Sequence, residues 1–165
     1  MKMLGDKYKA LMAQTSGDTT ALEAAFSLLV CAGAIDEDCT NRLKPHGLSE
    51  GGFAVLVVLL EADEPLQPSQ LALKIGVTRA TITGLLDTLE KWGYIIRLND
   101  TVDRRRYVVA LSVQGREKAQ SLKDEHGQWL TNLFSTLSPQ EQTLLLNLLQ
   151  KIYFATDKGK HNEAF

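Results

Sequence analysis

The 165-residue sequence predicts a mainly α-helical fold with one small β-hairpin, and three observations support this prediction. Several stretches have helical apolar spacing, with a capping residue before them and Gly or Pro after them. The segment 94–111 has two runs of β-branched residues around a polar tip. Hydrophobic residues make up 44% of the chain and charged residues 23%, which is typical of a folded globular protein.

The first predicted helix begins at a capping box formed by Thr20 and Glu23 and runs to about Leu43. In such a box the threonine hydroxyl accepts a hydrogen bond from the amide of Glu23, and the glutamate side chain reaches back. The sequence "SGD" before Thr20 is typical of a break. Residues 1–18 are therefore expected to form a short N-terminal arm.

A second helix is expected after Ser49, which suits its N-cap. The valine-rich run 53–60 would also suit a buried strand, and periodicity alone does not decide between the two. We predict a helix because no partner strand of similar type lies nearby.

The next two helices lie close together in the sequence. Pro68 suits the first position of a helix of about eight residues that ends at Gly76. Thr78 suits the N-cap of a second helix, which ends at Gly93. A short helix, a tight turn containing glycine and a second helix form a helix-turn-helix.

Strands are expected at 94–98 and 106–111, on either side of a tip that carries Asp103 and three consecutive arginines. A hairpin in this position makes the arrangement a winged helix. A long polar helix is then expected from Ser112 to about Leu137. The last helix follows a capping box, Ser138 to Glu141, and is apolar around most of its circumference.

Charge is distributed unevenly along the chain. The net charge is −2, which by itself argues against a nucleic-acid-binding protein. The segment Lys74–Arg106 nevertheless carries a net charge of +3, and the rest of the chain carries −5. This asymmetry is typical of a localised anion-binding face.

The segments 77–97, "VTRATITGLLDTLEKWGYIIR", and 103–119, "DRRRYVVALSVQGREKA", resemble the MarR-type (multiple antibiotic resistance regulator) transcription factors. The order of the expected helices extends the resemblance to nearly the whole chain. The resemblance implies a sequence-specific DNA-binding regulator, most often a repressor. It also implies that Arg105 enters a minor groove and that Asp103 orients this arginine by a charge-assisted hydrogen bond.

The start of the second helix of the helix-turn-helix is the other expected DNA contact, because a recognition helix meets base edges there. Capping alone would also explain Thr78, and solubility alone would explain a charged hairpin tip. Residue by residue, the expected DNA-contacting side chains are Ser69, Thr78, Arg79, Thr81, Thr83, Arg97, Asp103, Arg104 and Arg105.

The remaining helices carry more apolar surface than one small domain covers, which predicts a homodimer on a pseudo-palindromic operator. The expected organisation is an arm at 1–18, a dimerisation region at 19–45 and 113–160, and a winged helix-turn-helix at 46–112. The family resemblance alone implies a small aromatic or phenolic effector that releases the DNA.

Other classes of function have weaker support in the sequence. No phosphate loop, dinucleotide fingerprint or metal-ligand spacing is recognised, so we expect neither an enzyme nor a cofactor nor a metal site. Two alternatives stay open: a winged helix that binds only proteins, and a redox-responsive regulator acting through Cys31 or Cys39. We expect a cytoplasmic protein with no membrane partner, because no signal peptide or membrane-length apolar run is recognised.

Overall fold

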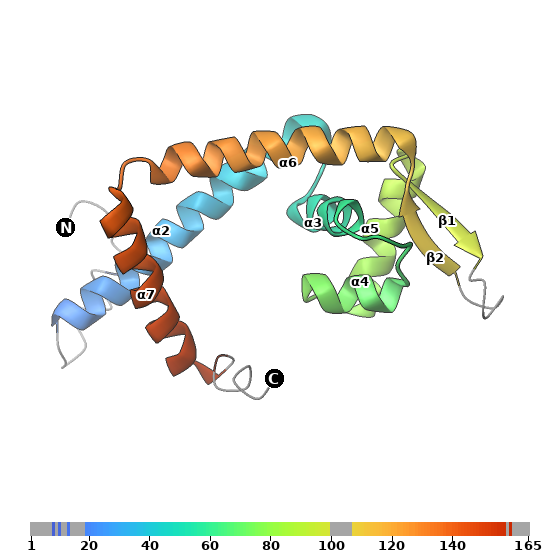
Figure 1. Ribbon diagram of the computed structural model, residues 1–165. Coiled ribbons are helices and arrows are strands. Elements are labelled where there is room, and N and C mark those ends of the chain that lie inside the picture. Colours follow the sequence, from blue (N-terminus) through green and yellow to red (C-terminus); the bar gives the residue numbers. More distant parts are fainter. Residues whose placement is uncertain are drawn as a thin grey trace. The chain divides into compact units, whose positions relative to one another are not determined.

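The computed structural model describes residues 8, 10, 13, 19–99, 107–157 and 159, which belong to two compact units, 1–120 and 121–165. Unit 1 contains four α-helices, a 3-10 turn and two strands in its described part, and α6 continues into unit 2 (Figure 1). In chain order the elements are α2 (Thr19–Leu43), η1 (Lys44–His46), α3 (Glu50–Leu60), α4 (Pro68–Ile75), α5 (Arg79–Lys91), β1 (Ile95–Asn99), β2 (Tyr107–Leu111), α6 (Val113–Phe134) and α7 (Pro139–Ala155). A mainly helical fold with one small hairpin is therefore confirmed.

Helix α2 differs from the sequence prediction in two respects. It already includes Thr19 and Thr20, so Thr20 lies inside the helix and not before it. The helical segment Thr19–His46 is also long and apolar enough to span a membrane by length and composition, so the expectation that no such run exists was wrong. No residue in the most apolar 18-residue stretch of this segment is buried within the chain, and Leu29 is 56% exposed. Length and composition are weak evidence for a membrane segment, because helices buried in protein interfaces share both properties.

The valine-rich run after Ser49 is helical, as predicted. The Ser49 hydroxyl accepts a hydrogen bond from the Gly52 amide at 3.2 Å and so caps α3. Val55, Leu56 and Leu59 of this helix are buried. The buried residues lie on one side of the helix and the other residues of the run are half-buried, so an apolar residue at nearly every position is compatible with a helix here.

The hairpin begins one residue later than predicted, at Ile95. The Tyr94 amide donates to the Leu89 carbonyl at 3.0 Å, so it closes the end of α5 and does not join the strand. Ile95 pairs with Leu111 and Asn99 with Tyr107 in the antiparallel ladder. Leu66, which precedes α4, adds an isolated bridge to Val109 that the sequence analysis did not predict.

The core of the winged-helix region lies where α3, α4, α5 and the hairpin meet, and Figure 1 shows these elements gathered together. Each contributes at least one fully buried aliphatic side chain. These side chains include Leu56 of α3, Leu71 of α4, Ile82 and Leu86 of α5, Ile95 of β1 and Val109 of β2. Their burial leaves the opposite face of α5 at the surface.

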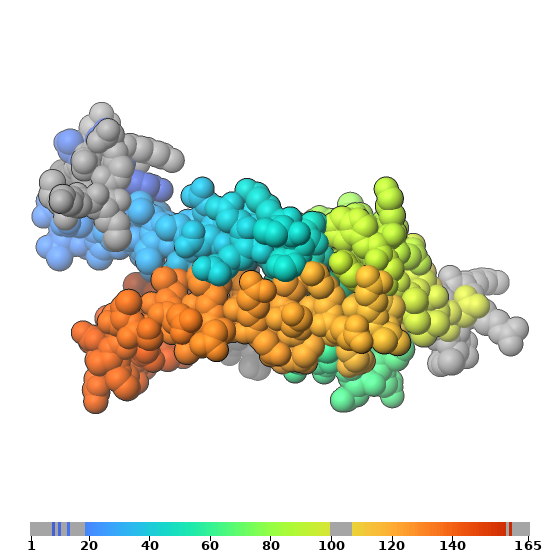
Figure 2. Space-filling view, turned by 90° about the horizontal axis from the view of Figure 1, so that it is seen from above, coloured from blue at the N-terminus to red at the C-terminus, as the bar shows by residue number. Residues whose placement is uncertain are grey.

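The first turns of α6 also belong to unit 1. In Figure 2 they lie against the segment that ends α2 and leads into α3, where Lys118 Nζ is 2.8 Å from His46 Nδ1. Ser112 precedes α6 and donates through its hydroxyl to the Gly93 carbonyl at 2.6 Å. These contacts connect the hairpin, the end of α5 and the start of the long helix.

Unit 2 contains the rest of α6 and all of α7. Helix α6 ends at Phe134, three residues before the predicted Leu137. The Ser135 hydroxyl donates to the Asn132 carbonyl at 2.7 Å, and Gln142 Nε2 donates to the Phe134 carbonyl at 3.0 Å. Side chains therefore satisfy carbonyl groups at this helix end, and the chain leaves the helix early.

Helix α7 begins at the predicted capping box. The Glu141 amide donates to the Ser138 hydroxyl, and the Ser138 amide donates to Glu141 Oε2 at 2.8 Å. No residue of α7 is buried within the chain. Its exposed apolar side chains include Leu144, Leu146, Leu148, Ile152 and Phe154.

Candidate nucleic-acid interface

The turn between α4 and α5 has the backbone conformation that its sequence predicts. Gly76 has a φ of 71°, a left-handed conformation that residues with a Cβ rarely adopt. Thr78 then caps α5, with its hydroxyl accepting from the Thr81 amide at 3.2 Å. The helix-turn-helix is therefore specified by one glycine and one threonine at the predicted positions.

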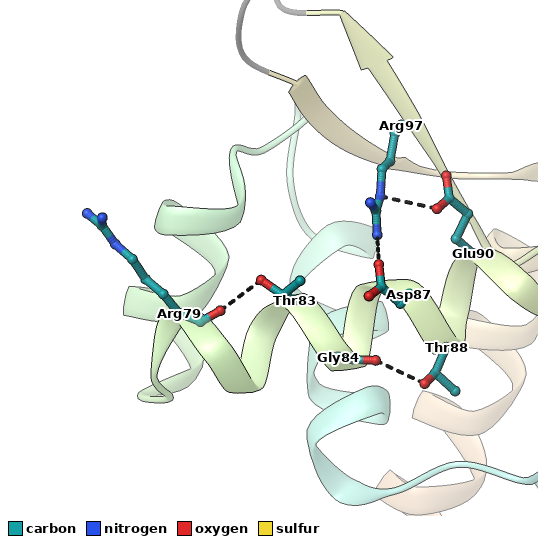
Figure 3. Close-up of polar contacts among 7 residues, drawn as sticks. All are labelled: Arg79, Thr83, Gly84, Asp87, Thr88, Glu90 and Arg97. Atoms are coloured by element: carbon teal, nitrogen blue, oxygen red, sulfur yellow. Dashed lines mark hydrogen bonds and ion pairs between the residues drawn. The ribbon is translucent and has the colours of Figure 1, made fainter.

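The four residues expected at the start of α5 all lie at the surface. Thr78, Arg79, Thr81 and Thr83 are exposed. The hydroxyls of Thr78 and Thr81 are 2.9 Å apart, and the Thr83 hydroxyl donates to the Arg79 carbonyl at 2.9 Å. Figure 3 shows the Arg79 side chain extending away from the helix, with its guanidinium clear of the other labelled side chains. The amides of the first turn and this guanidinium make a positively polarised surface.

An open groove of about 500 Å³ lies beside this surface. Its lining includes Ser69 from the start of α4, Arg79 and Thr83 from α5, and Tyr107 from β2. The structure thus brings the predicted Ser69 close to two predicted residues of α5, although ten or more positions separate them in sequence. Tyr107 also lines the groove and was not among the predicted site residues.

Arg97 of β1, one of the predicted DNA contacts, makes its polar contacts with α5. Its Nη2 donates to Asp87 Oδ1, and its Nε is 3.2 Å from Glu90 Oε2, so two carboxylates of α5 hold the guanidinium (Figure 3). The guanidinium carbon also lies 5.0 Å from the centre of the Tyr107 ring. The hydrogen bond with Asp87 is the main reason why the pKa of Arg97 is raised above its ordinary value. Arg97 therefore connects the base of the hairpin to α5.

Asp87 and Glu90 were missed as site residues, although the sequence contains a signal for them. Residues three apart on a helix lie on the same side of it, so Asp87 and Glu90 form an acidic pair on α5. A lone arginine on the strand that packs against this helix is a natural partner for such a pair. The sequence does not show which face of the strand turns toward α5.

The expected wing residues Asp103, Arg104 and Arg105, and the neighbouring Arg106, lie outside the described part of the chain. Their predicted roles are neither supported nor opposed by the structure. The described strands end at Asn99 and resume at Tyr107, on either side of this segment.

The two cysteines differ in their surroundings. Burial raises the pKa of the Cys39 thiol to about 11, and the hydrogen bond and negative charge of Glu50 act in the same direction. A thiol with so high a pKa is almost wholly protonated at neutral pH and reacts slowly with oxidants. Cys31 is exposed on the same helix. In the described ranges, no group of three or more His, Cys, Asp or Glu side chains is placed to hold a metal ion.

Comparison with known proteins places this geometry in a family. The MarR family model matches residues 48–107, which cover α3 to the first residue of β2. The chain is 30% identical over 137 residues to the HTH-type transcriptional repressor YetL of Bacillus subtilis, covering 82% of each chain. The chain belongs to the MarR family. As a MarR-family protein it is a DNA-binding transcriptional regulator and not an enzyme, so the alternative of a winged helix that binds only proteins is not retained.

Solved structures agree with this assignment at the level of the fold. The DNA complex of MepR from Staphylococcus aureus superposes with a TM-score of 0.71 at 20% identity, covering 80% of this chain and 97% of MepR. A MarR-family regulator from a Rhodococcus species superposes with a TM-score of 0.68 at 25% identity, covering 86% of this chain and all of that one. The winged helix-turn-helix is therefore confirmed.

Proposed function

We propose that this MarR-family protein is a homodimeric repressor whose α5 enters the major groove of a pseudo-palindromic operator. The observation that carries the proposal is the exposed start of α5, where Arg79 and three threonines lie at the surface and Arg79 and Thr83 line the groove that includes Ser69. A guanidinium recognises guanine by two hydrogen bonds, and threonine methyl groups pack against thymine methyl groups. Repression is supported by the likeness to YetL, whose name describes a repressor.

In this proposal the contacts divide into two groups. Thr78, Arg79, Thr81 and Thr83 face base edges and nearby phosphates, and Ser69 meets the phosphate backbone at the start of α4. Asp103, Arg104 and Arg105 keep the wing role that the family resemblance implies. Arg97 is reassigned: because two carboxylates of α5 hold it, it supports the wing and does not itself face the DNA.

Homodimer formation is supported by apolar surface that each unit leaves uncovered. In unit 1, Leu29 of α2 is 56% exposed, and the most apolar window of that helix has no buried residue. In unit 2, Leu144 and Ile152 of α7 are 57% and 51% exposed. A 17-residue helix with no buried residue is marginal in water by itself, so a second copy of the chain is the natural cover.

An aromatic or phenolic acid remains the proposed effector, and only the family resemblance supports it. Such a molecule would release the operator only by binding more tightly to the dimer conformation that does not bind DNA. A cytoplasmic location belongs to the same proposal, because the operator DNA lies in that compartment.

The test is binding of the purified protein to the DNA upstream of its own gene, measured by fluorescence anisotropy at 50 and 200 mM salt with random duplex as competitor. Nanomolar affinity that resists the competitor and falls as salt rises is the expected result, since each neutralised phosphate adds to the salt slope. Sedimentation in the same buffers should give the mass of a dimer. Equal affinity for the upstream and random duplexes, and for a pool of random sequences after selection, would contradict the proposal.

A further inference from the structure

Gly84 lies in the middle of α5, and none of the residues that the structure describes requires a glycine there. A Cβ built on Gly84 would meet no atom within 4 Å. Its φ is not positive, because the described glycines with positive φ are Gly47, Gly76 and Gly93. A glycine inside an exposed helix lowers stability relative to alanine. An alanine at this position would therefore make the helix more stable than the glycine does.

The position of Gly84 on the helix points it away from the core. Ile82 and Leu86 are buried, and Gly84 is two residues from each of them. At 100° per residue, it lies about 200° around the helix from both and so on the outer face. Ala80, one turn earlier, is also exposed, and so is Thr88, one turn later. The outward face of α5 therefore has no long side chain at its centre.

The polar side chains next to Gly84 already make hydrogen bonds within the protein. The Thr88 hydroxyl donates to the Gly84 carbonyl at 2.9 Å, and the Thr83 hydroxyl donates to the Arg79 carbonyl (Figure 3). Asp87 accepts from Arg97. Both hydroxyl protons are thus directed at the backbone of α5, and the threonines present methyl groups and oxygen lone pairs outward.

We propose that Gly84 is a specificity-determining residue, at which the absence of a side chain lets α5 come closest to the base edges. The bases that face Gly84 are then read by close apolar contact, with the 5-methyl group of thymine filling the space above the glycine. This inference rests on the proposed placement of α5 in the major groove. It explains why a less stable helix residue occupies the outer face of the element that meets DNA.

Gly127 in α6 offers a matched control. It is also exposed in the middle of a helix, and a Cβ built on it would meet no atom within 4 Å. Its carbonyl accepts from the Thr131 hydroxyl at 2.9 Å, just as the Gly84 carbonyl accepts from Thr88. Gly84→Ala and Gly127→Ala therefore make the same chemical change in the same local structure on different helices.

The experiment compares the wild type with Gly84→Ala, Gly84→Leu and Gly127→Ala. Each protein selects sequences from a pool of random duplexes, and its affinity for the wild-type selected duplex is measured by anisotropy. Both alanine variants should raise Tm by roughly 1–4 °C, because alanine favours helix. Gly84→Ala should bind several-fold more weakly, Gly84→Leu at least tenfold more weakly, and both should select different bases at the same positions of each half-site. Gly127→Ala should keep the wild-type affinity and the wild-type selected sequence.

A second arm tests the thymine contact with the wild-type protein. Replacing thymine by uracil at the positions that change in the Gly84 variants removes only the methyl group and should weaken binding several-fold. If the Gly84 variants keep the wild-type affinity and sequence preference, or lose affinity equally for all sequences, the inference is wrong while the proposed function stands. If the wild type enriches no sequence at all, the proposed function fails, and this inference fails with it.

Discussion

Alanine at position 115 should destabilise the protein, although alanine favours helix more than glycine does. Gly115 is buried in the first turn of α6, and a Cβ built on it would lie 1.8 Å from the Tyr94 carbonyl oxygen and 2.6 Å from the carbonyl carbon. Both of these atoms belong to the backbone, so no side-chain rotation relieves the clash. The first turn of α6 must therefore move away from the turn that follows α5.

The size of the effect follows from what this movement disrupts. The Ser112 amide donates to the Tyr94 carbonyl at 3.0 Å, and the Ser112 hydroxyl donates to the Gly93 carbonyl at 2.6 Å. Two such hydrogen bonds contribute roughly 1–3 kcal/mol, and overpacking adds about 1–3 kcal/mol. The greater helix propensity of alanine offsets about 0.5–1 kcal/mol of this loss. We expect Gly115→Ala to lower the free energy of unfolding by about 2–4 kcal/mol.

Urea unfolding followed by circular dichroism measures this change, at one fixed protein concentration because a dimer's stability depends on it. A loss of this size corresponds to a fall in Tm of roughly 5–15 °C. Gly127→Ala serves as the control, because the same substitution there should raise stability. If Gly115→Ala proved as stable as the wild type, the close approach of α6 to Tyr94 would be wrong.

Three further predictions concern the charged groups and the thiols. Arg97→Ala and Asp87→Ala should each lower the free energy of unfolding by about 0.5–1 kcal/mol. The double variant should lose less than the sum of the two single losses, because both changes break the same ion pair. Strictly additive losses in urea unfolding would contradict that pairing. With Cys31 replaced by serine, Cys39 should react with iodoacetamide at pH 7 far more slowly than free cysteine, because its pKa of about 11 leaves roughly one thiol in ten thousand ionised. A rate equal to that of free cysteine would contradict the raised pKa of this thiol. Glu141 accepts hydrogen bonds from the Ser138 amide and hydroxyl, which lower its pKa below the ordinary value of 4.5. The ionised carboxylate of Glu141 therefore stabilises the fold at pH values above 4.5, and this contribution is lost as the pH falls through the lowered pKa. Glu141→Gln should thus be less stable than the wild type at pH 7 and equally stable at pH 2. A difference in Tm that persisted at pH 2 would show that the capping charge is not responsible.

The features that the sequence predicted correctly depend on residues close together in the chain. Gly76 adopts the left-handed conformation that a tight turn between two helices needs, and Ser138 and Glu141 cap each other three residues apart. The position at which α5 begins, with Arg79 and its threonines in the first turns, follows from Thr78 capping that helix. In each case the amino acid itself determines a backbone conformation or a short-range hydrogen bond, so the local sequence contains the necessary information.

The features that needed the tertiary structure join residues that are distant in sequence or depend on which face of an element turns inward. Arg97 forms an ion pair with Asp87, ten residues away in the sequence, and the sequence analysis did not identify that partner. The bridge from Leu66 to Val109 is also long-range, because it depends on how the segment before α4 meets the hairpin. Side-chain type alone does not specify such pairings, since a strand can present either face to its neighbours.

By itself, the sequence therefore determined the order of the elements, the family and the surface that we propose meets DNA, because capping, turn chemistry and apolar periodicity act within a few residues. Only the tertiary structure decided that Arg97 pairs with Asp87 and Glu90 of α5, that Gly115 must be a glycine and that Gly84 need not be one for folding. Each of these conclusions depends on which atoms surround a residue. Those surroundings are set by the packing of α5, α6 and the hairpin against one another.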